Sequence, residues 1–440
     1  MQLNVDIWCL LQLRVSSLLS NGSHILVLDC DMYSNDPTSA KAAMCFHLDP
    51  TLSPSLAFVQ FPQMFHNISP TDIYCGQLRE LFKVWWYGCD GLNGPLLSGT
   101  GFYMKREALY GTAPEDYMTG FRLHCKGWNS VYYDPPRPQF LGSTPNNMNA
   151  FLVQNKRWTS GLLQVTFSRY CPLTYGIMSG HSILHTMCIS YGAFMPLYSI
   201  FALCYATVPQ LGLLNGISLY PKVSDPWFAV FAAVFISGSC QHLFEVLHTG
   251  GSFRMWWNEL RIWMFKSVSA NFFGCLDFAT KLFGVKQVDF GLTSKVTEED
   301  QVDRYAKGVF DFQGAGLILV PVVTSSILNM AALIGGVWRV IVEGNYSALM
   351  VQLFLTLLIT ISSYPIIEGI VIRRDAGRVP PLITFFSLIC TMVLLSLGFI
   401  VFTIHSCMVF KSKRKKKKKR WKKRIARRRR RGAEEGFIEP

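Results

Sequence analysis

The sequence lacks the cysteine patterns that build small metal sites and disulfide frameworks. Its 13 cysteines include no C-x-x-C pair and no cluster with the spacing of metal ligands. Several stand in apolar stretches, namely Cys188, Cys204, Cys240, Cys390 and Cys407. We therefore interpret the cysteines as reduced, small hydrophobic residues. Residues 1–12 also lack the basic leader and the small-residue cleavage site of a secretory signal peptide.

Charge is absent from a long internal part of the chain, because no Asp, Glu, Lys or Arg occurs between Arg169 and Lys222. Residues 13–170 have the mixed composition of a soluble α/β domain, whereas apolar spans dominate from about Ile177 onward. Five stretches have the roughly 20 mostly apolar residues needed to cross a hydrocarbon core of about 30 Å. They lie near Ser182–Thr207, Trp227–Leu247, Gly314–Val337, Tyr346–Ile367 and Leu382–His405. The sequence therefore predicts a multi-pass integral membrane protein in a lipid bilayer.

One aromatic stretch, Phe253–Phe283, differs from these spans because it also carries Arg, Lys, Glu and Asp. That composition predicts a helix lying in the membrane interface. If residues 1–170 face the cytosol, four crossings return the arginines of the loop Arg373–Arg378 to the cytosolic side, as the positive-inside bias requires. A fifth crossing places the basic C-terminal tail in the lumen, against the same bias.

The net charge of +14 comes from the C-terminal end of the chain. Lys411–Arg431 contains 17 of the 42 basic residues. Without residues 411–440, 25 basic and 25 acidic residues remain, so the body of the chain is neutral and nucleic acid is a poor candidate partner. The tail itself is of low complexity, and we expect it to be disordered.

An acidic pair follows a short apolar run. Ile25–Leu28 predicts a strand buried on both faces, as in parallel sheets. Asp29 and Asp31 come directly after it, and residues two apart on an extended backbone point to one side. Open α/β sheets bind ligands at this end of their strands, and two carboxylates there suit a divalent cation that also holds phosphate oxygens. A solvated turn is the competing interpretation for an isolated Asp-x-Asp.

A third acidic position precedes a predicted helix. Glu115 and Asp116 follow Pro114, and Tyr117–His124 is the predicted helix. The helix N-terminus favours the ionised form of a carboxylate, which can then act as a general base. The alternative is an acid that only satisfies backbone amides at the helix start.

A polar and aromatic face is predicted on the helix Phe151–Phe167. Gln154, Arg157 and Trp158 share one side of it, at i, i+3 and i+4. A Trp face stacks on sugar rings, Gln bonds hydroxyl groups, and Arg binds phosphate. An ordinary helix surface remains the alternative for this motif alone.

Together, Asp-Cys-Asp at 29–31, Glu-Asp at 115–116 and Gln-x-x-Arg-Trp at 154–158 resemble the cellulose synthase superfamily of inverting nucleotide-sugar glycosyltransferases. Four further segments are most similar to the plant cellulose synthase-like G and E groups: Val27–Pro37, Glu115–Trp128, Pro135–Gly142 and Tyr220–Trp227. The resemblance implies an α/β cytosolic glycosyltransferase domain, GT-A-like and partial, over residues 13–170. An all-α transmembrane bundle over residues 171–410 would follow, and residues 1–12 stay unassigned.

The resemblance also implies roles for individual residues. Asp29 and Asp31 would hold the sugar diphosphate through Mg²⁺ or Mn²⁺, and Asp116 would deprotonate the acceptor hydroxyl. Acceptor and diphosphate binding would fall to Gln154, Arg157 and Trp158. A gating-like loop near residues 286–296 would contain Phe290, Thr293 and Lys295.

The activity implied first is sugar transfer from a UDP-sugar to a polysaccharide acceptor, a β-glucan or related plant cell wall polymer. The alternative is glucuronosyl or glycosyl transfer to triterpenoid aglycones at the endoplasmic reticulum. A third possibility is an inactive truncated membrane protein, because full-length members carry two transmembrane helices and an earlier Asp motif before the point that matches Leu13. We expect the protein in a Golgi membrane, with the endoplasmic reticulum or plasma membrane as alternatives. The sequence is compatible with a homo- or hetero-oligomer.

Overall fold

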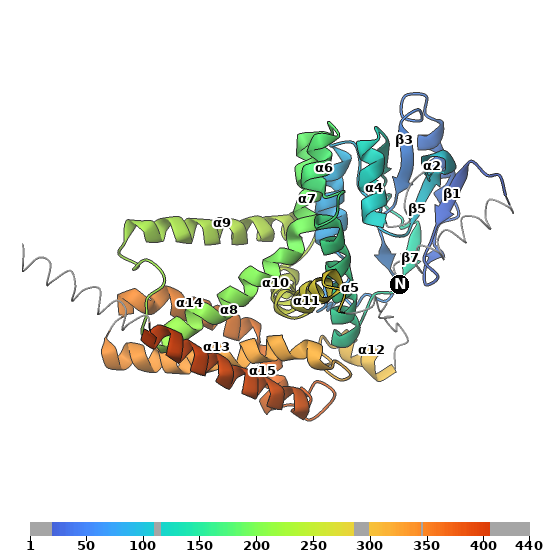
Figure 1. Cartoon of the computed structure of the whole chain (residues 1–440). Coiled ribbons are helices and arrows are strands. Elements are labelled where there is room, and N and C mark those ends of the chain that lie inside the picture. Colours follow the sequence, from blue (N-terminus) through green and yellow to red (C-terminus); the bar gives the residue numbers. More distant parts are fainter. Residues whose placement is uncertain (1–19, 110–115, 286–298, 345, 405–440) are drawn as a thin grey trace, which may run out of the picture.

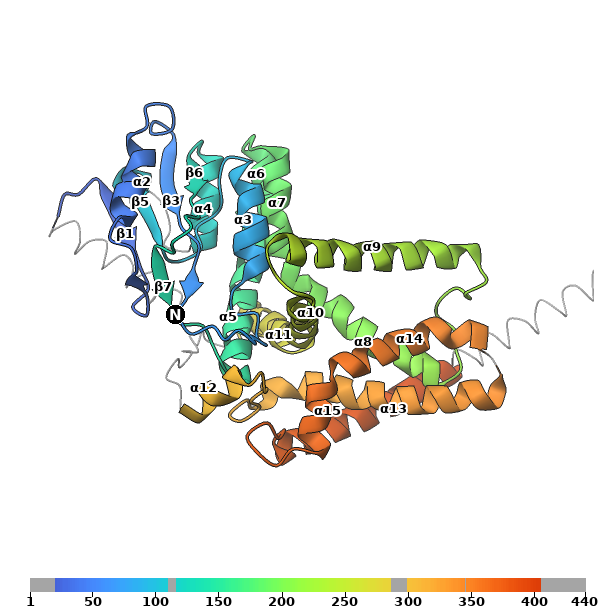
Figure 2. The ribbon, with the colours of Figure 1, turned by 180° about the vertical axis from the view of Figure 1, so that it is seen from behind.

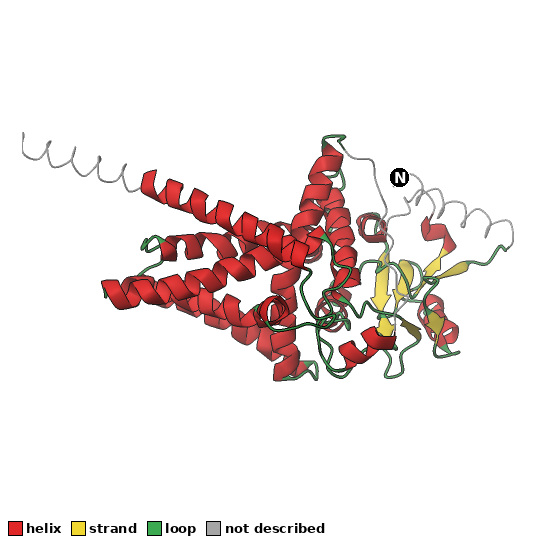
Figure 3. Cartoon of the chain, turned by 90° about the horizontal axis from the view of Figure 1, so that it is seen from below, coloured by secondary structure: helices red, strands yellow, loops and turns green. Residues whose placement is uncertain are grey.

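The computed structural model describes residues 20–109, 116–285, 299–344 and 346–404. Within them, a small domain with two mixed sheets precedes a larger helical part (Figure 1, Figure 3). This order confirms the expected α/β domain followed by an all-α transmembrane bundle. The unassigned residues 1–12, the gating-like loop near 286–296 with Phe290, Thr293 and Lys295, and the tail 411–440 lie outside the described residues.

The larger sheet has the strand order β1-β5-β3-β6. Strand β5 (Phe102–Lys105) is antiparallel to both β1 (His24–Val27) and β3 (Leu56–Gln60), and β3 is parallel to β6 (Asn129–Tyr132). A smaller sheet joins β2 (Tyr33–Ser34), β7 (Phe140–Gly142) and β4 (Met64–Phe65). The short helices of this domain are α2 (Ser39–Leu48), α3 (Trp86–Asp90) and α4 (Asp116–Cys125).

The prediction for β1 was wrong in its burial and its pairing. Strand β1 is the outer strand of the described sheet and pairs only antiparallel, with Val27 opposite Phe102. Leu26 is 39% exposed, whereas every residue of β3 is buried. An apolar run predicts a strand. The neighbouring strands in the sheet come from distant parts of the chain, so the run alone does not decide whether the strand lies inside the sheet or at its edge.

The membrane part agrees with the five predicted apolar stretches. Among the described residues, four helices are long and apolar enough to cross a bilayer: Ile183–Leu214, Pro226–His248 (α9), Leu317–Glu343 and Pro381–Ile404. The first comprises α7 (Ile183–Phe194), a 3₁₀ turn and α8 (Tyr198–Leu214), and the third contains α13 (Val320–Glu343). The remaining stretch is broken, since α14 (Tyr346–Ser362) and α15 (Tyr364–Val371) meet at a 62° bend and make a fifth span only if taken together.

The predicted interfacial stretch forms two helices, α10 (Phe253–Val268) and α11 (Ala270–Leu282). They are seen nearly end-on in two opposite views in which α8, α9 and α13 lie along the plane of the picture (Figure 1, Figure 2). The pair therefore runs across the spans. That direction suits helices lying in a membrane interface.

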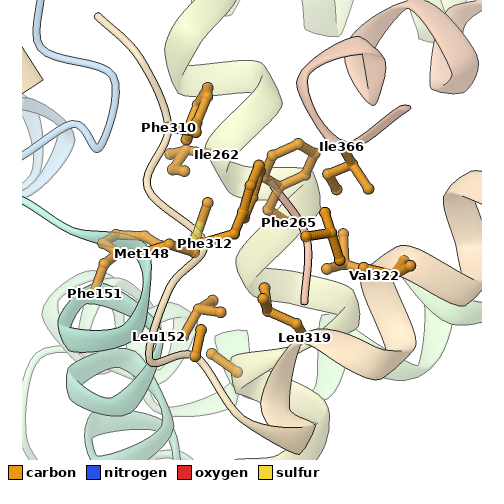
Figure 4. Close-up of a cluster of buried hydrophobic side chains, with 14 of the residues drawn as sticks. Met148, Phe151, Leu152, Ile262, Phe265, Phe310, Phe312, Leu319, Val322 and Ile366 are labelled. Carbon is orange, nitrogen blue, oxygen red and sulfur yellow. The ribbon is translucent and has the colours of Figure 1, made fainter. Parts of the chain in front are cut away.

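Helix α5 (Met148–Thr166) joins the two parts through a shared core. Met148, Phe151 and Leu152 of α5 pack into one buried cluster with side chains of α10, α13 and α15 (Figure 4). The other labelled members of this cluster are Ile262, Phe265, Phe310, Phe312, Leu319, Val322 and Ile366. Because the cluster is continuous, the helix bearing Gln154, Arg157 and Trp158 is fixed against the membrane part.

Helix α9 is attached mainly at its C-terminal end. Of its residues only Val246 is buried, and along the rest of the helix Phe235 makes a ring contact with Phe354 of α14. At that end, His242 contacts Glu259 of α10 at 2.9 Å, and Glu259 forms a two-pronged ion pair with Arg79 of the α/β domain. This buried network links three segments that are distant in sequence.

Candidate functional site

The turn that carries the acidic pair is held by a neighbouring glycine-containing loop. The backbone N–H of Asp29 donates to Thr100 Oγ1 at 2.9 Å, and Gly101 N donates to Val27 O at 2.9 Å. Thr100 is 1% exposed, and Gly101 has a φ of 70°, a left-handed conformation that glycine adopts without strain. The loop therefore sets the direction in which the chain leaves β1.

A buried amide fixes this loop in turn. Gln60 at the end of β3 is fully buried, and its Nε2 donates to Thr100 O at 2.9 Å and to Phe61 O at 2.8 Å. Its Oε1 accepts from Ser98 N at 3.1 Å. Sequence reasoning assigned no role to Thr100 or Gln60. The available signals were the Gly-Thr-Gly turn and a Gln at the end of an apolar run.

Of the two carboxylates, Asp29 acts electrostatically on the arginine of α5. Asp29 is exposed and Asp31 is half-buried, both just past β1. Burial lowers the pKa of the half-buried Arg157 guanidinium, while the charge of Asp29 acts in the opposite direction. Arg157 is therefore within electrostatic reach of Asp29, although the two residues are more than a hundred positions apart.

Asp29 and Asp31 could bind a divalent cation only if substrate oxygens completed its coordination. In the described part of the chain, no group of three or more His, Cys, Asp or Glu side chains is placed to hold a metal ion. Mg²⁺ is commonly bound by one or two carboxylates together with substrate phosphates and water. Asp29 and Asp31, hard oxygen ligands at an open strand end, suit that kind of site.

Helix α5 presents the predicted face. Its N-terminus is capped by Asn147, whose Oδ1 accepts from Ala150 N at 2.8 Å. Gln154 and Arg157 are half-buried, and Trp158 is 38% exposed. The exposed indole is placed one turn after Gln154 on the same side. The opposite side of α5 packs into the buried core, whereas the Trp158 indole does not. Its ring can therefore stack on a ligand.

Helix α11 supports α5 from behind. Thr159 Oγ1 donates to Asn271 Oδ1 at 3.0 Å, and Ser160 Oγ donates to Asp277 Oδ2 at 3.1 Å. Burial would raise the pKa of Asp277, but the Lys281 ammonium, 2.7 Å from its carboxylate, lowers it overall and keeps the group ionised. Sequence reasoning missed this support, because α5 and α11 are separated by about a hundred residues.

The remaining predicted site residues are not brought into this arrangement by what the structure describes. Asp116 is the first residue of α4, and its side chain is outside the description. Phe290, Thr293 and Lys295 fall in the undescribed stretch 286–298. Of the predicted site residues, the structure therefore describes the side chains of Asp29, Asp31, Gln154, Arg157 and Trp158.

Comparison with known proteins gives consistent matches. The family model described as cellulose synthase matches residues 10–115 and 110–420. Quillaic acid 3-O-glycosyltransferase CSL1 of Saponaria officinalis is 42% identical over 436 residues, covering 83% of this chain and 62% of the relative. Cellulose synthase-like protein E2 of Oryza sativa subsp. japonica is 33% identical over 425 residues, covering 84% of this chain and 56% of the relative.

A more distant relative is cellulose synthase A catalytic subunit 9 [UDP-forming] of Oryza sativa, 27% identical over 497 residues, covering 87% of this chain and 47% of that protein. The chain thus spans about three fifths of the length of the first two relatives, at 62% and 56%. The family model nevertheless covers both the α/β domain and the membrane part, and with it the Asp pair and the Arg-Trp face. The chain belongs to the cellulose synthase family.

Proposed function

We propose that the protein is a membrane-embedded inverting glycosyltransferase that moves a sugar from a UDP-sugar to a triterpenoid aglycone. The observation that carries this proposal is that Asp29 lies within electrostatic reach of Arg157, next to the exposed Trp158, on the helix that joins the α/β domain to the membrane helices. Acidic and guanidinium groups at one strand end match the needs of a metal-bound diphosphate. An indole next to them matches an acceptor ring.

Each residue has a distinct part in the proposed reaction. Asp29 and Asp31 would hold Mg²⁺ or Mn²⁺, which when bound neutralises charge on the leaving diphosphate. Arg157 would bind the diphosphate oxygens, and Gln154 would donate to a hydroxyl. Asp116 would take the proton of the acceptor hydroxyl as that oxygen attacks the anomeric carbon from the side opposite UDP. One such displacement inverts the configuration at that carbon.

Two observations support a small acceptor. The relative at 42% identity is named for transfer to quillaic acid. In addition, α8 and α13 pack closely: a Cβ at Gly336 would lie 2.6 Å from the Leu213 side chain. Buried polar side chains of neighbouring helices also bond to the backbone of α8. Gln352 Nε2 donates to Pro209 O and Asn329 Nδ2 donates to Ala206 O, both at 2.9 Å. These groups hold helices together, so a polymer passing there would have to displace them.

Polysaccharide synthesis is the second candidate. It is favoured by the relatives named cellulose synthase and cellulose synthase-like protein. For either reaction we propose the endoplasmic reticulum or Golgi membrane as the site. The product discriminates the two: a soluble mono-glycosylated triterpenoid supports the first, and an insoluble glucan that lengthens with time supports the second.

The test uses microsomes containing the full chain, supplied with UDP-glucuronic acid or UDP-glucose, Mn²⁺ and either quillaic acid or a glucan primer. Loss of a general base costs about 10²–10⁴ in rate, so Asp116→Asn should reduce product formation by that factor. Asp303→Asn, which changes an exposed ion pair on α12 (Glu299–Ala306), is the matched control and should keep the wild-type rate. Equal rates for wild type and Asp116→Asn would refute the assigned base. Absence of UDP binding in calorimetric titration with Mn²⁺ would instead favour a non-catalytic membrane protein.

A further inference from the structure

Two thiols far apart in sequence meet where the α/β domain joins the first span. Cys89 lies on α3 and Cys188 on α7, and their sulfur atoms are 3.3 Å apart. Cys89 is fully buried, whereas Cys188 is partly exposed. A disulfide bond is about 2.0 Å long, so bond formation needs the two sulfur atoms to approach by little more than 1 Å.

The region around Cys188 packs on the α/β domain at the start of the first span. The span Ile183–Leu214 has 32 residues, about twelve more than a hydrocarbon core requires. Its first turns dock on the domain: Tyr117 Oη donates to Ile189 O at 2.6 Å, and Thr166 Oγ1 donates to Ala193 O. Ile189 is also buried in a core cluster with Trp86 and Phe121. We therefore infer that Cys188, partly exposed at the domain end of the span, is within reach of water-soluble oxidants and reductants.

An indole donor prepares the exposed thiol for reaction. Trp85 Nε1 donates to Cys188 Sγ at 3.1 Å, and a donor to sulfur favours the thiolate, which is the nucleophilic form. The indole is held in place by its packing against α7, since a Cβ added at Gly192 would lie 1.7 Å from Trp85 Cη2. The ring therefore occupies the space that the missing side chain leaves.

We propose that Cys89 and Cys188 form a reversible redox site, oxidised to a disulfide by hydrogen peroxide and restored by a thiol such as reduced glutathione. The Cys188 thiolate attacks one peroxide oxygen, which gives a sulfenic acid and hydroxide. The Cys89 sulfur then attacks the Cys188 sulfur, and the sulfenic oxygen leaves as water. Two thiols lose two electrons and two protons in all, and one peroxide becomes two waters.

The disulfide ties the α/β domain to the first span. Helix α3 is bonded to strand β6 of the larger sheet, because Tyr132 N donates to Asp90 Oδ1 at 2.7 Å. Helix α7 continues through the 3₁₀ turn into α8. A bond between residues 89 and 188 closes a loop of about a hundred residues, and cross-links of long loops restrict the unfolded chain most. Oxidation should therefore raise the thermal midpoint by about 5 °C or more.

The experiment treats the full chain in detergent with hydrogen peroxide and digests it with trypsin without reductant. The expected product is peptide 84–105 joined to peptide 170–222, with fragment ions that place the bond at Cys89 and Cys188. The thermal midpoint should rise on oxidation and fall again with dithiothreitol. Neither effect depends on sugar transfer, so both can be observed whether or not the proposed function holds.

Single variants make the assignment testable. Cys89→Ser and Cys188→Ser should each abolish the linked peptide and the thermal shift, whereas Cys45→Ser, at an exposed position on α2, should keep both. Reduced samples of all variants are compared first, which identifies any that fold poorly. The proposal is overturned if wild-type protein loses its exposed thiols to peroxide without forming the 89–188 link. It is also overturned if the thermal shift persists in Cys89→Ser.

Discussion

Replacement of Glu259 by Gln should destabilise the protein strongly, because it leaves a buried guanidinium without its counter-charge. Arg79 Nε and Nη2 donate to the two carboxylate oxygens of Glu259, both at 2.7 Å. The two side chains are only 4% and 14% exposed. Arg79 Nη1 also donates to Glu245 O and to Thr249 Oγ1 at the end of α9, so its position is held from two sides.

The expected cost follows from burial. Removing one partner of a buried, hydrogen-bonded ion pair costs about 3–5 kcal/mol, because the other charge stays desolvated. An exposed pair is worth about 0–1 kcal/mol. Lys307 and Asp303, 66% and 62% exposed, provide that comparison within the same chain, and Asp303→Asn should change stability little. The contrast between Glu259→Gln and Asp303→Asn tests the role of burial directly.

The same pair makes a pH-dependent contribution. Burial acts to raise the pKa of Glu259, but hydrogen bonds from Arg79 and His242 lower it overall from its ordinary value of 4.5. A carboxylate with a lowered folded-state pKa stabilises the protein above its unfolded-state pKa, and this contribution is lost as the pH falls through the folded-state pKa. Below about pH 4.5, wild type should therefore lose stability more steeply than Glu259→Gln.

Thermal unfolding in detergent, followed by tryptophan fluorescence, measures the loss of stability. The signal reports on the surroundings of Glu259, because Trp256, Trp257 and Trp263 lie on the same helix, α10. A midpoint lowered by about 5 °C or more is expected. The double variant Arg79→Met with Glu259→Met should recover much of the loss, since neither charge then remains buried. A midpoint for Glu259→Gln equal to that of Asp303→Asn would refute the reasoning.

Three further changes test the site and its support. Trp158→Ala should raise the KM for acceptor about tenfold with UDP binding unchanged, while Trp158→Phe keeps most of the affinity. Thr100→Val should cost about 1–3 kcal/mol by removing the hydroxyl that accepts from the Asp29 N–H and should weaken Mn²⁺-dependent UDP binding in calorimetry, whereas Thr100→Ser should not. Gly274→Ala, whose Cβ would lie 2.5 Å from a side chain of α5, should lower the unfolding midpoint through about 1–3 kcal/mol of overpacking. Gly161→Ala, with nothing within 4 Å, should raise it slightly.

Local sequence patterns were sufficient to predict the membrane spans and the polar and aromatic face of α5. The five apolar stretches matched four spans and one bent pair, because crossing a bilayer requires a long run of apolar residues that any window of sequence displays. The face of α5 was equally readable, since residues at i, i+3 and i+4 of a helix always share a side. The break at Ser363 between α14 and α15 was not predicted, although Pro365 in the first turn of α15 is a local signal for the end of the preceding helix.

The sequence by itself determined which residues are acidic, aromatic or apolar at each element, and hence the membrane character and the candidate motifs. Only the tertiary structure decided the pairing of β1, the electrostatic effect of Asp29 on Arg157, the support of α5 by α11 and the contact of Cys89 with Cys188. Each of these joins segments separated by about eighty to a hundred and thirty residues. Short-range periodicity carries no information on such contacts, because they depend on how whole elements pack.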